Sequence, residues 1–226
     1  KSVLSQSYKN FEIIIIYDDE DKSELNKIRF FIKNNKKIKI FVNKKNLGAG
    51  ESRNKAARIA KGKYLAFIDA DDIWRKDKIA LQLKFMKKNK LSISHTTYSI
   101  INDNGKKISI RMASKKLNYN ELLNSCDIGL STVIIKKKLF LKNKFSTNKT
   151  KEDYALWLKI AKKKIIYGFN KNLTLWRKSD NSLSSNIFQK FYDAFDIYYN
   201  REKFNFMTSI YKVMILSFNF LKKNNQ

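Results

Sequence analysis

Residues 64–72 read YLAFIDADD, a short apolar run that ends in a cluster of carboxylates. Five successive apolar residues are typical of a strand that is buried on both faces of a parallel sheet. Asp69 and Asp71 come directly after the run, so two acidic side chains stand where the strand ends. In open α/β sheets, ligands bind in the crevice outside the carboxyl ends of the strands. The segment therefore indicates an α/β fold and the place of a binding site within it.

The chain before this segment repeats the pattern of strand, polar turn and helix. Short apolar strands are predicted at residues 12–16 and 38–42, with Asp18 after the first and Asn46 after the second. The expected helices span residues 23–34, 51–60 and 76–88. In the first of them, one face carries Leu25, Ile28, Phe31 and Ile32. Such alternation predicts a mostly parallel sheet with right-handed crossovers. Three strand ends would then carry polar, mainly acidic residues, which is the strongest sign of a site.

The second half of the chain has a mixed pattern. Residues 92–101 and 107–112 alternate around Asp103-Asn104-Gly105, which predicts a hairpin. Further elements are expected at residues 119–125 (helix), 131–135 (strand) and 152–163 (helix). Two apolar segments flanked by Lys follow at residues 187–199 and 206–221. They are too short and too interrupted to cross a bilayer, so we expect them either to lie on an anionic membrane surface or to pack on the domain or a partner.

The composition excludes several classes of protein. With 226 residues, 43% of them hydrophobic, the chain can bury a core and is not intrinsically disordered. Its single cysteine, Cys126, cannot form an internal disulfide, which favours the cytoplasm. The net charge of +28 comes almost entirely from Lys, and Pro is absent, so we attribute most of the charge to genome composition. A surface rich in Lys still attracts nucleotide phosphates, nucleic acid or acidic lipids.

Asp69 and Asp71 are the candidate metal ligands. Carboxylates two residues apart at the end of a strand can converge on one hard divalent ion, and Mg²⁺ or Mn²⁺ is usually held by one or two carboxylates together with substrate phosphates. Such a site suits a nucleoside diphosphate. The alternative is a structural turn in which Asp72 caps the helix that follows.

Several stretches in a fixed order carry a resemblance to a known family. They are residues 2–16, Asn46-Leu47-Gly48 with Arg53-Asn54, residues 62–74, residues 152–158 and residues 175–184. In this order they resemble glycosyltransferase family 2, the nucleotide-sugar transferases of GT-A fold. The resemblance implies a GT-A (Rossmann-like) α/β catalytic domain over residues 1–185, with a mostly parallel sheet flanked by helices, and a helical extension over residues 186–226.

The resemblance also implies an activity and partners. The expected enzyme is an inverting, metal-dependent glycosyltransferase that uses Mg²⁺ or Mn²⁺. It would move a sugar from a nucleotide-diphosphate donor to a glycan or lipid-linked acceptor in cell-surface polysaccharide synthesis. We expect it in the cytoplasm, with an anionic membrane surface, the inner face of the cytoplasmic membrane, as a further partner.

The residues that would bind the donor follow from the matching positions. Asp18 and Asn46 would contact the nucleotide sugar, and Arg53 would lie near its diphosphate. Asp69 would touch the ribose and, with Asp71, hold the metal ion on the diphosphate.

Asp153 matches the catalytic base of the family. An inverting transfer needs a carboxylate that removes the proton of the acceptor hydroxyl while this hydroxyl attacks the anomeric carbon. The alternative interpretation is that Glu152 and Asp153 are acids that stabilise the N-terminus of a helix.

The sequence departs from the family pattern at four places. A strand ending in Tyr-Asn is expected before Lys1, so the chain resembles a member truncated at its N-terminus. The usual Asp-Asp-Gly-Ser is replaced by residues 17–20, YDDE, and Lys76 and Ser179 replace a Pro and a His.

Two other functions stay open on the sequence alone. One is a non-catalytic GT-A-like binding module, and the other is a basic nucleic-acid-binding protein. The acids at three strand ends disfavour the second, because they would repel phosphates unless a metal intervened. His95 and Cys126 are best explained as a structural histidine and a small buried thiol.

Overall fold

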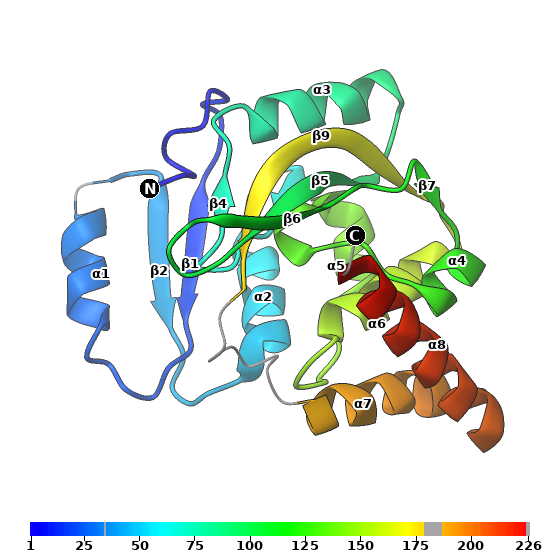
Figure 1. Ribbon diagram of the computed structural model, residues 1–226. Helices are drawn as coiled ribbons and strands as arrows, with labels where there is room; N and C mark the ends of the chain where they lie inside the picture. Colours follow the sequence, from blue (N-terminus) through cyan, green and yellow to red (C-terminus); the bar gives the residue numbers. More distant parts are fainter. Residues whose placement is uncertain (34, 179–186, 225–226) are drawn as a thin grey trace.

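The computed structural model describes residues 1–33, 35–178 and 187–224 (Figure 1). A mixed sheet occupies its centre. In spatial order its main strands are β3 (Tyr64–Ala66), β8 (Ile134–Lys136), β5 (Ile93–Ile101), β9 (Ile166–Arg177) and β4 (Ile73–Trp74). β6 (Lys107–Arg111) pairs with β5, and β7 (Lys116–Leu117) pairs with β9. A separate two-stranded sheet holds β1 (Ile13–Tyr17) and β2 (Ile38–Val42).

The α/β class is confirmed, but the directions of the strands are more mixed than the sequence predicts. β1 and β2 run parallel, as do β5 and β9. The other strand pairs within the described residues are antiparallel. One cause is the hairpin between β5 and β6, where Gly105 has a φ of +78°, a conformation that glycine adopts without strain.

Helices cover both sides of the sheet, and in Figure 1 α3 lies above β9 and β5 while α6 lies below them. The helices of the first half are α1 (Leu25–Ile32), α2 (Gly48–Ile59) and α3 (Lys78–Lys88). Those of the second half are α4 (Tyr119–Asn124), the short η1 (Leu130–Thr132), α5 (Lys137–Asn143) and α6 (Glu152–Ala161). On α1 only Leu25 is buried, and Phe31 faces solvent, so the face expected from the periodicity does not form part of the core.

The main core is built around α6. Trp157 and Leu158 are fully buried there, and the cluster extends into the last part of the chain through Tyr198 and Val213. That part contains α7 (Ile187–Asp196), the π-helical turn η3 (Ile197–Arg201) and α8 (Phe206–Asn224). The helical extension therefore packs on the domain, while its predicted boundary at residue 185 lies outside the described residues.

Buried amides fasten α3 and the first residues to the sheet. The Gln82 side chain donates to the carbonyl oxygens of Ser94 and Thr132, at 3.0 Å each. Gln6 donates to the carbonyl of Arg75 at 2.8 Å and accepts from the N–H of Ile79 at 3.0 Å. These bonds set the position of the segment between β3 and α3, which carries the acidic turn.

One close approach in the sheet region requires glycine. A Cβ at Gly168 would lie 2.2 Å from the carbonyl oxygen of Ser114, whereas a Cβ at Gly129 would meet nothing nearer than 3.4 Å. We expect Gly168→Ala to lower the free energy of unfolding by about 3 kcal/mol, because backbone must move, and Gly129→Ala to lower it by less than about 1 kcal/mol. Urea denaturation measures both, and equal effects would contradict this packing.

Candidate functional site

The acidic turn after β3 is held in place by its own backbone and by η1. The N–H of Asp72 donates to the carbonyl of Asp69, and the N–H of Asp69 donates to Ser131 Oγ at 3.0 Å. Asp71 is exposed, whereas Asp72 is buried and its Oδ1 accepts from the N–H of Arg177 at 2.9 Å. Asp72 therefore binds the end of β9. The alternative prediction that it caps α3 is wrong, because α3 begins only at Lys78 and Asp72 is already engaged.

Arg53, on α2, joins this turn to the beginning of α6. Its Nη2 donates to Asp69 Oδ1 at 2.7 Å, and its Nη1 donates to Glu152 Oε1. The Arg53 side chain is 22% exposed, and that of Glu152 is 11% exposed. Burial by itself would lower the pKa of Arg53, but the charges of Asp69 and Glu152 outweigh it and raise the pKa. The guanidinium is thus a fixed positive charge at the centre of the site.

Asp153 lies beside this ion pair, in the first turn of α6. Burial, the largest cause, and the charge of Glu152 raise the pKa of its carboxyl, which comes to about 7. The charge of Arg53 acts in the opposite direction, and the charge of Asp69 contributes a smaller increase. A carboxyl with a pKa near neutrality, close to a bound arginine, can accept a proton from a hydroxyl.

The start of α6 is positioned from two sides. On one side, the Thr150 N–H and hydroxyl both donate to Asp193 Oδ2 of α7, at 2.7 Å each. On the other, Gly50 of α2 lets the chain approach closely, since a Cβ there would lie 2.6 Å from the carbonyl oxygen of Ser146. The side chain of Asn54 also accepts from the N–H of Phe145 at 3.0 Å. These contacts bring Glu152 within reach of Arg53.

Asp18 and Asn46 form a second group, at the end of β1 and the start of α2. Asp18 Oδ1 accepts from Asn43 Nδ2 at 2.6 Å and from the N–H of Leu47 at 2.9 Å. Asn46 is exposed, and its Oδ1 accepts from the N–H of Gly48 at 3.0 Å. Asn43 also donates to Ser52 Oγ at 2.9 Å. Since Ser52 and Arg53 are consecutive on α2, this helix connects the two groups of predicted site residues.

Asp69 and Asp71 offer the hard oxygen donors that Mg²⁺ and Mn²⁺ prefer. Within residues 1–33, 35–178 and 187–224, no group of three or more His, Cys, Asp or Glu side chains could hold a metal ion. The two carboxylates fit a divalent ion only if a substrate supplies the remaining oxygens, which is how Mg²⁺ is commonly bound with nucleotides.

Some residues of the site have no clear signal in the sequence. Asn43 and Ser131 carry contacts that fix the predicted residues, yet nothing in their neighbourhood distinguishes them from surface polar residues. Glu152 is expected only as an acid at a helix N-terminus, and its pairing with Arg53 has no signal in the sequence. Residues 179 and 181–184, which the family resemblance includes, lie outside the described residues. His95 is buried, and burial lowers its pKa to about 4, in agreement with a structural role.

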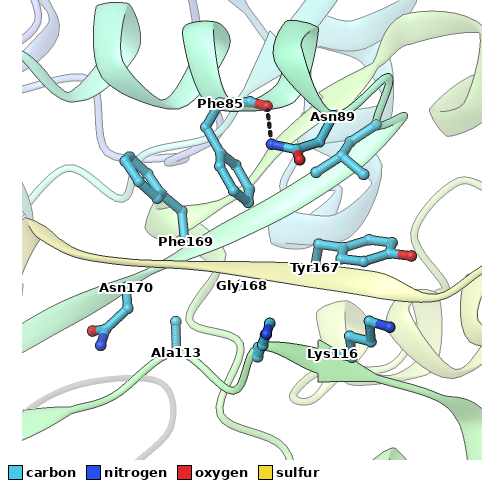
Figure 2. Close-up of a pocket in the computed structure, with 10 residues that line it drawn as sticks. Phe85, Asn89, Ala113, Lys116, Tyr167, Gly168, Phe169 and Asn170 are labelled. Atoms are coloured by element: carbon cyan, nitrogen blue, oxygen red, sulfur yellow. Dashed lines mark hydrogen bonds between the residues drawn. The ribbon is translucent and has the colours of Figure 1, made fainter.

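A cavity of about 620 Å³ lies away from the acidic turn, between α3 and the first residues of β9 (Figure 2). The Phe85 and Phe169 rings stack there with centroids 4.6 Å apart. The acidic turn contacts β9 at Arg177, eight residues further along the strand, so at 3.3 Å per residue the cavity is a separate feature.

Comparisons with known proteins find a family model, similar sequences and similar folds. The family model described as "Glycosyl transferase family 2" matches residues 1–148. A UDP-Glc:alpha-D-GlcNAc-diphosphoundecaprenol beta-1,3-glucosyltransferase of Escherichia coli, WfgD, is 36% identical, and the match covers 87% of this chain and 77% of that protein. An uncharacterized glycosyltransferase of Rickettsia conorii is 42% identical over 79% of this chain, which spans only 30% of that relative's length.

A solved structure has a similar fold. It is the mannosyltransferase PcManGT from Pyrobaculum calidifontis, in complex with GDP-Man and Mn²⁺. The TM-score is 0.67 at 12% identity, over 90% of this chain and 59% of that chain. At this identity the similarity concerns the fold.

The Arg53 bridge can be tested by stability. We expect Arg53→Met to lower the free energy of unfolding by about 3 kcal/mol, because two partly buried carboxylates lose their partner. The matched control is Arg58→Met, on the same helix, whose pair with Glu51 is exposed and contributes about 1 kcal/mol or less. Urea denaturation of both variants gives the comparison, and equal losses would show that the bridge is not structural.

The raised pKa of Asp153 predicts how stability depends on pH. Folded chains hold this proton up to pH about 7, whereas unfolded chains release it near the ordinary pKa of an aspartate, 3.8. Between these values the folded state binds more protons, so the contribution of Asp153 to stability falls as the pH rises. We therefore expect Asp153→Asn to be more stable than the wild type at about pH 8, by up to about 4 kcal/mol, with the difference vanishing near pH 4.

Thermal and urea unfolding at several pH values measure this difference. Asp103→Asn, in the exposed β5–β6 turn, is the control and should follow the wild type at every pH. A pH-independent difference between the Asp153→Asn variant and the wild type would mean that the carboxyl titrates normally.

Proposed function

Because this chain belongs to glycosyl transferase family 2, we propose that it transfers a sugar from a nucleotide-diphosphate donor to an acceptor hydroxyl, with inversion at the anomeric carbon. The observation that carries the proposal is the position of Asp153: a carboxyl with a pKa of about 7 stands beside the Arg53 bridge to the acidic turn. A base and a site for a diphosphate are thus close together.

Asp153 is the proposed general base. Its carboxylate accepts the proton of the acceptor hydroxyl while the hydroxyl oxygen bonds to the anomeric carbon and the bond from this carbon to the diphosphate oxygen breaks. Glu152 is less suited to this step, because Arg53 holds its carboxylate. A pKa near neutrality lets Asp153 be ionised before the reaction and still be basic enough to take the proton.

The donor site is proposed at the acidic turn and the end of β1. Asp18 and Asn46 bind the nucleoside, and Asp69 binds its ribose. Arg53 supports this arrangement by fixing Asp69 Oδ1. A divalent ion, Mg²⁺ or Mn²⁺, held by Asp69 and Asp71 together with the diphosphate oxygens would supply positive charge for the leaving group. The complex of a structurally similar mannosyltransferase with GDP-Man and Mn²⁺ supports this choice of ion.

The printed name of the Escherichia coli relative suggests the substrates. That protein uses UDP-Glc and an acceptor on diphosphoundecaprenol. We propose a UDP-sugar donor and a lipid-linked saccharide acceptor for this chain as well, in the synthesis of a surface polysaccharide at the cytoplasmic membrane.

The activity is tested by release of nucleoside diphosphate from a panel of donors, with a lipid-diphosphate saccharide acceptor and Mn²⁺. We expect turnover that a chelator abolishes, and a loss of about 10²- to 10⁴-fold in both Asp153→Asn and Asp71→Asn, because one removes the base and the other a metal ligand. The control Asp103→Asn should keep wild-type turnover. Unchanged turnover in both site variants would refute the assigned mechanism.

A further inference from the structure

The last helix of the described chain presents its apolar side to solvent. Met207, Tyr211, Met214, Phe218 and Leu221 recur along α8 at intervals of three or four residues, so they form one stripe along the helix. Each is between 56% and 73% exposed. We call these five residues the α8 stripe.

The opposite side of the same helix faces the protein and makes polar contacts beside its buried apolar residues. Lys212 Nζ donates to Asn124 Oδ1, and Asn219 Nδ2 donates to the carbonyl of Asn124, at 2.9 Å each. Lys223 Nζ donates to Asp127 Oδ2 at 2.6 Å. A surface helix normally buries its apolar face and exposes its charged one. α8 buries Val213 and Leu216 on its inner side and still exposes a second apolar side, and exposed apolar surface of this extent marks an interaction site.

The neighbouring helix adds to the same kind of surface. In α7, Phe188 and Tyr192 lie one turn apart and are even more exposed than most of the α8 stripe. Figure 1 shows α7 and α8, drawn in orange and red, next to each other at one end of the molecule.

Charge decides between the partners that could cover such a surface. A second copy of this chain also has a net charge of +28, so pairing would bring two strongly basic molecules together. A bilayer with anionic headgroups instead attracts the basic protein, by about 1 kcal/mol for each Lys near the bilayer surface. Exposed Lys203 and Lys222 lie next to the two ends of the stripe.

We propose that the α8 stripe, together with Phe188 and Tyr192, docks the protein on an anionic lipid bilayer. Among the residues that the structure describes, no helix is long and apolar enough to cross a membrane. The helix would therefore lie in the headgroup region with its apolar side buried about 5–10 Å deep, as interfacial helices do.

The contacts of α8 relate this surface to the candidate site, a step that rests on the proposed function. Lys223 donates to Ser125 Oγ and to Asp127, the residues on either side of Cys126. Burial and the charge of Asp153 raise the pKa of the Cys126 thiol, and this loop therefore lies close enough to the proposed base to feel its charge. A docked α8 would place a lipid-linked acceptor near Asp153.

The test compares binding to vesicles in the absence of any donor. The wild type should sediment with vesicles of phosphatidylcholine and phosphatidylglycerol and much less with phosphatidylcholine alone. The variant M214S/F218S should bind the mixed vesicles at least tenfold more weakly, because two buried apolar side chains contribute more than 1.4 kcal/mol. The matched control is F30S/F31S, since these α1 side chains are at least as exposed, and it should bind like the wild type.

Two results would overturn the proposal. One is equal vesicle binding by M214S/F218S and the wild type, with thermal unfolding showing that both are folded. The other is a wild type that does not bind vesicles but is a dimer by light scattering, while M214S/F218S is a monomer. The stripe would then be the contact between two copies of the chain.

This assay does not depend on glycosyl transfer, so it still decides the docking question if the proposed function fails. If that function holds, M214S/F218S should lose turnover on an acceptor embedded in vesicles and keep it on the same acceptor dispersed in detergent. An equal loss of turnover on both acceptor preparations would show that the stripe has no part in access to the acceptor.

Discussion

The site depends on one arginine that is shared between two carboxylates. Arg53 comes from α2, Asp69 from the turn after β3, and Glu152 from the start of α6. Each of the three charges is partly buried, and a buried charge destabilises the fold unless it is paired. Only an arrangement that brings the three segments together satisfies all of them. The bridge therefore determines where the acidic turn stands relative to Asp153.

Helix α2 can serve this purpose because consecutive residues on it reach different segments. Ser52 contacts Asn43, and through it Asp18; Arg53 reaches the acidic turn and α6; and Asn54 holds the backbone of Phe145. Gly50 gives the chain near Ser146 room to approach. Helix α2 thus sets the distances between the proposed nucleotide-binding residues and the proposed base, and a shift of α2 would disturb both groups.

Much of this arrangement could be predicted from the sequence, for identifiable physical reasons. Apolar runs followed by Asp18 and Asp69 predict strands that end near these residues, and β1 and β3 lie there. Gly105 marks its hairpin by the turn that it permits. The sequence does not show in the same way which distant residue will pair with a charged side chain. Glu152 and Asp72 look like surface acids until the fold brings Arg53 and the end of β9 to them.

The same limit applies to α8, with a consequence for the whole molecule. Periodicity gives its apolar stripe but not the side that the stripe faces, which is set by distant polar partners such as Asn124 and Asp127. Those partners lie at the end of α4 and in the loop that follows it, near the proposed base, and α7 likewise holds Thr150 three residues before Asp153. The extension thus fixes and buries the surroundings of the base with its polar contacts. Because those contacts and the buried Val213 and Leu216 occupy the inner side of α8, the apolar stripe is left outside, where only a further partner can remove it from water.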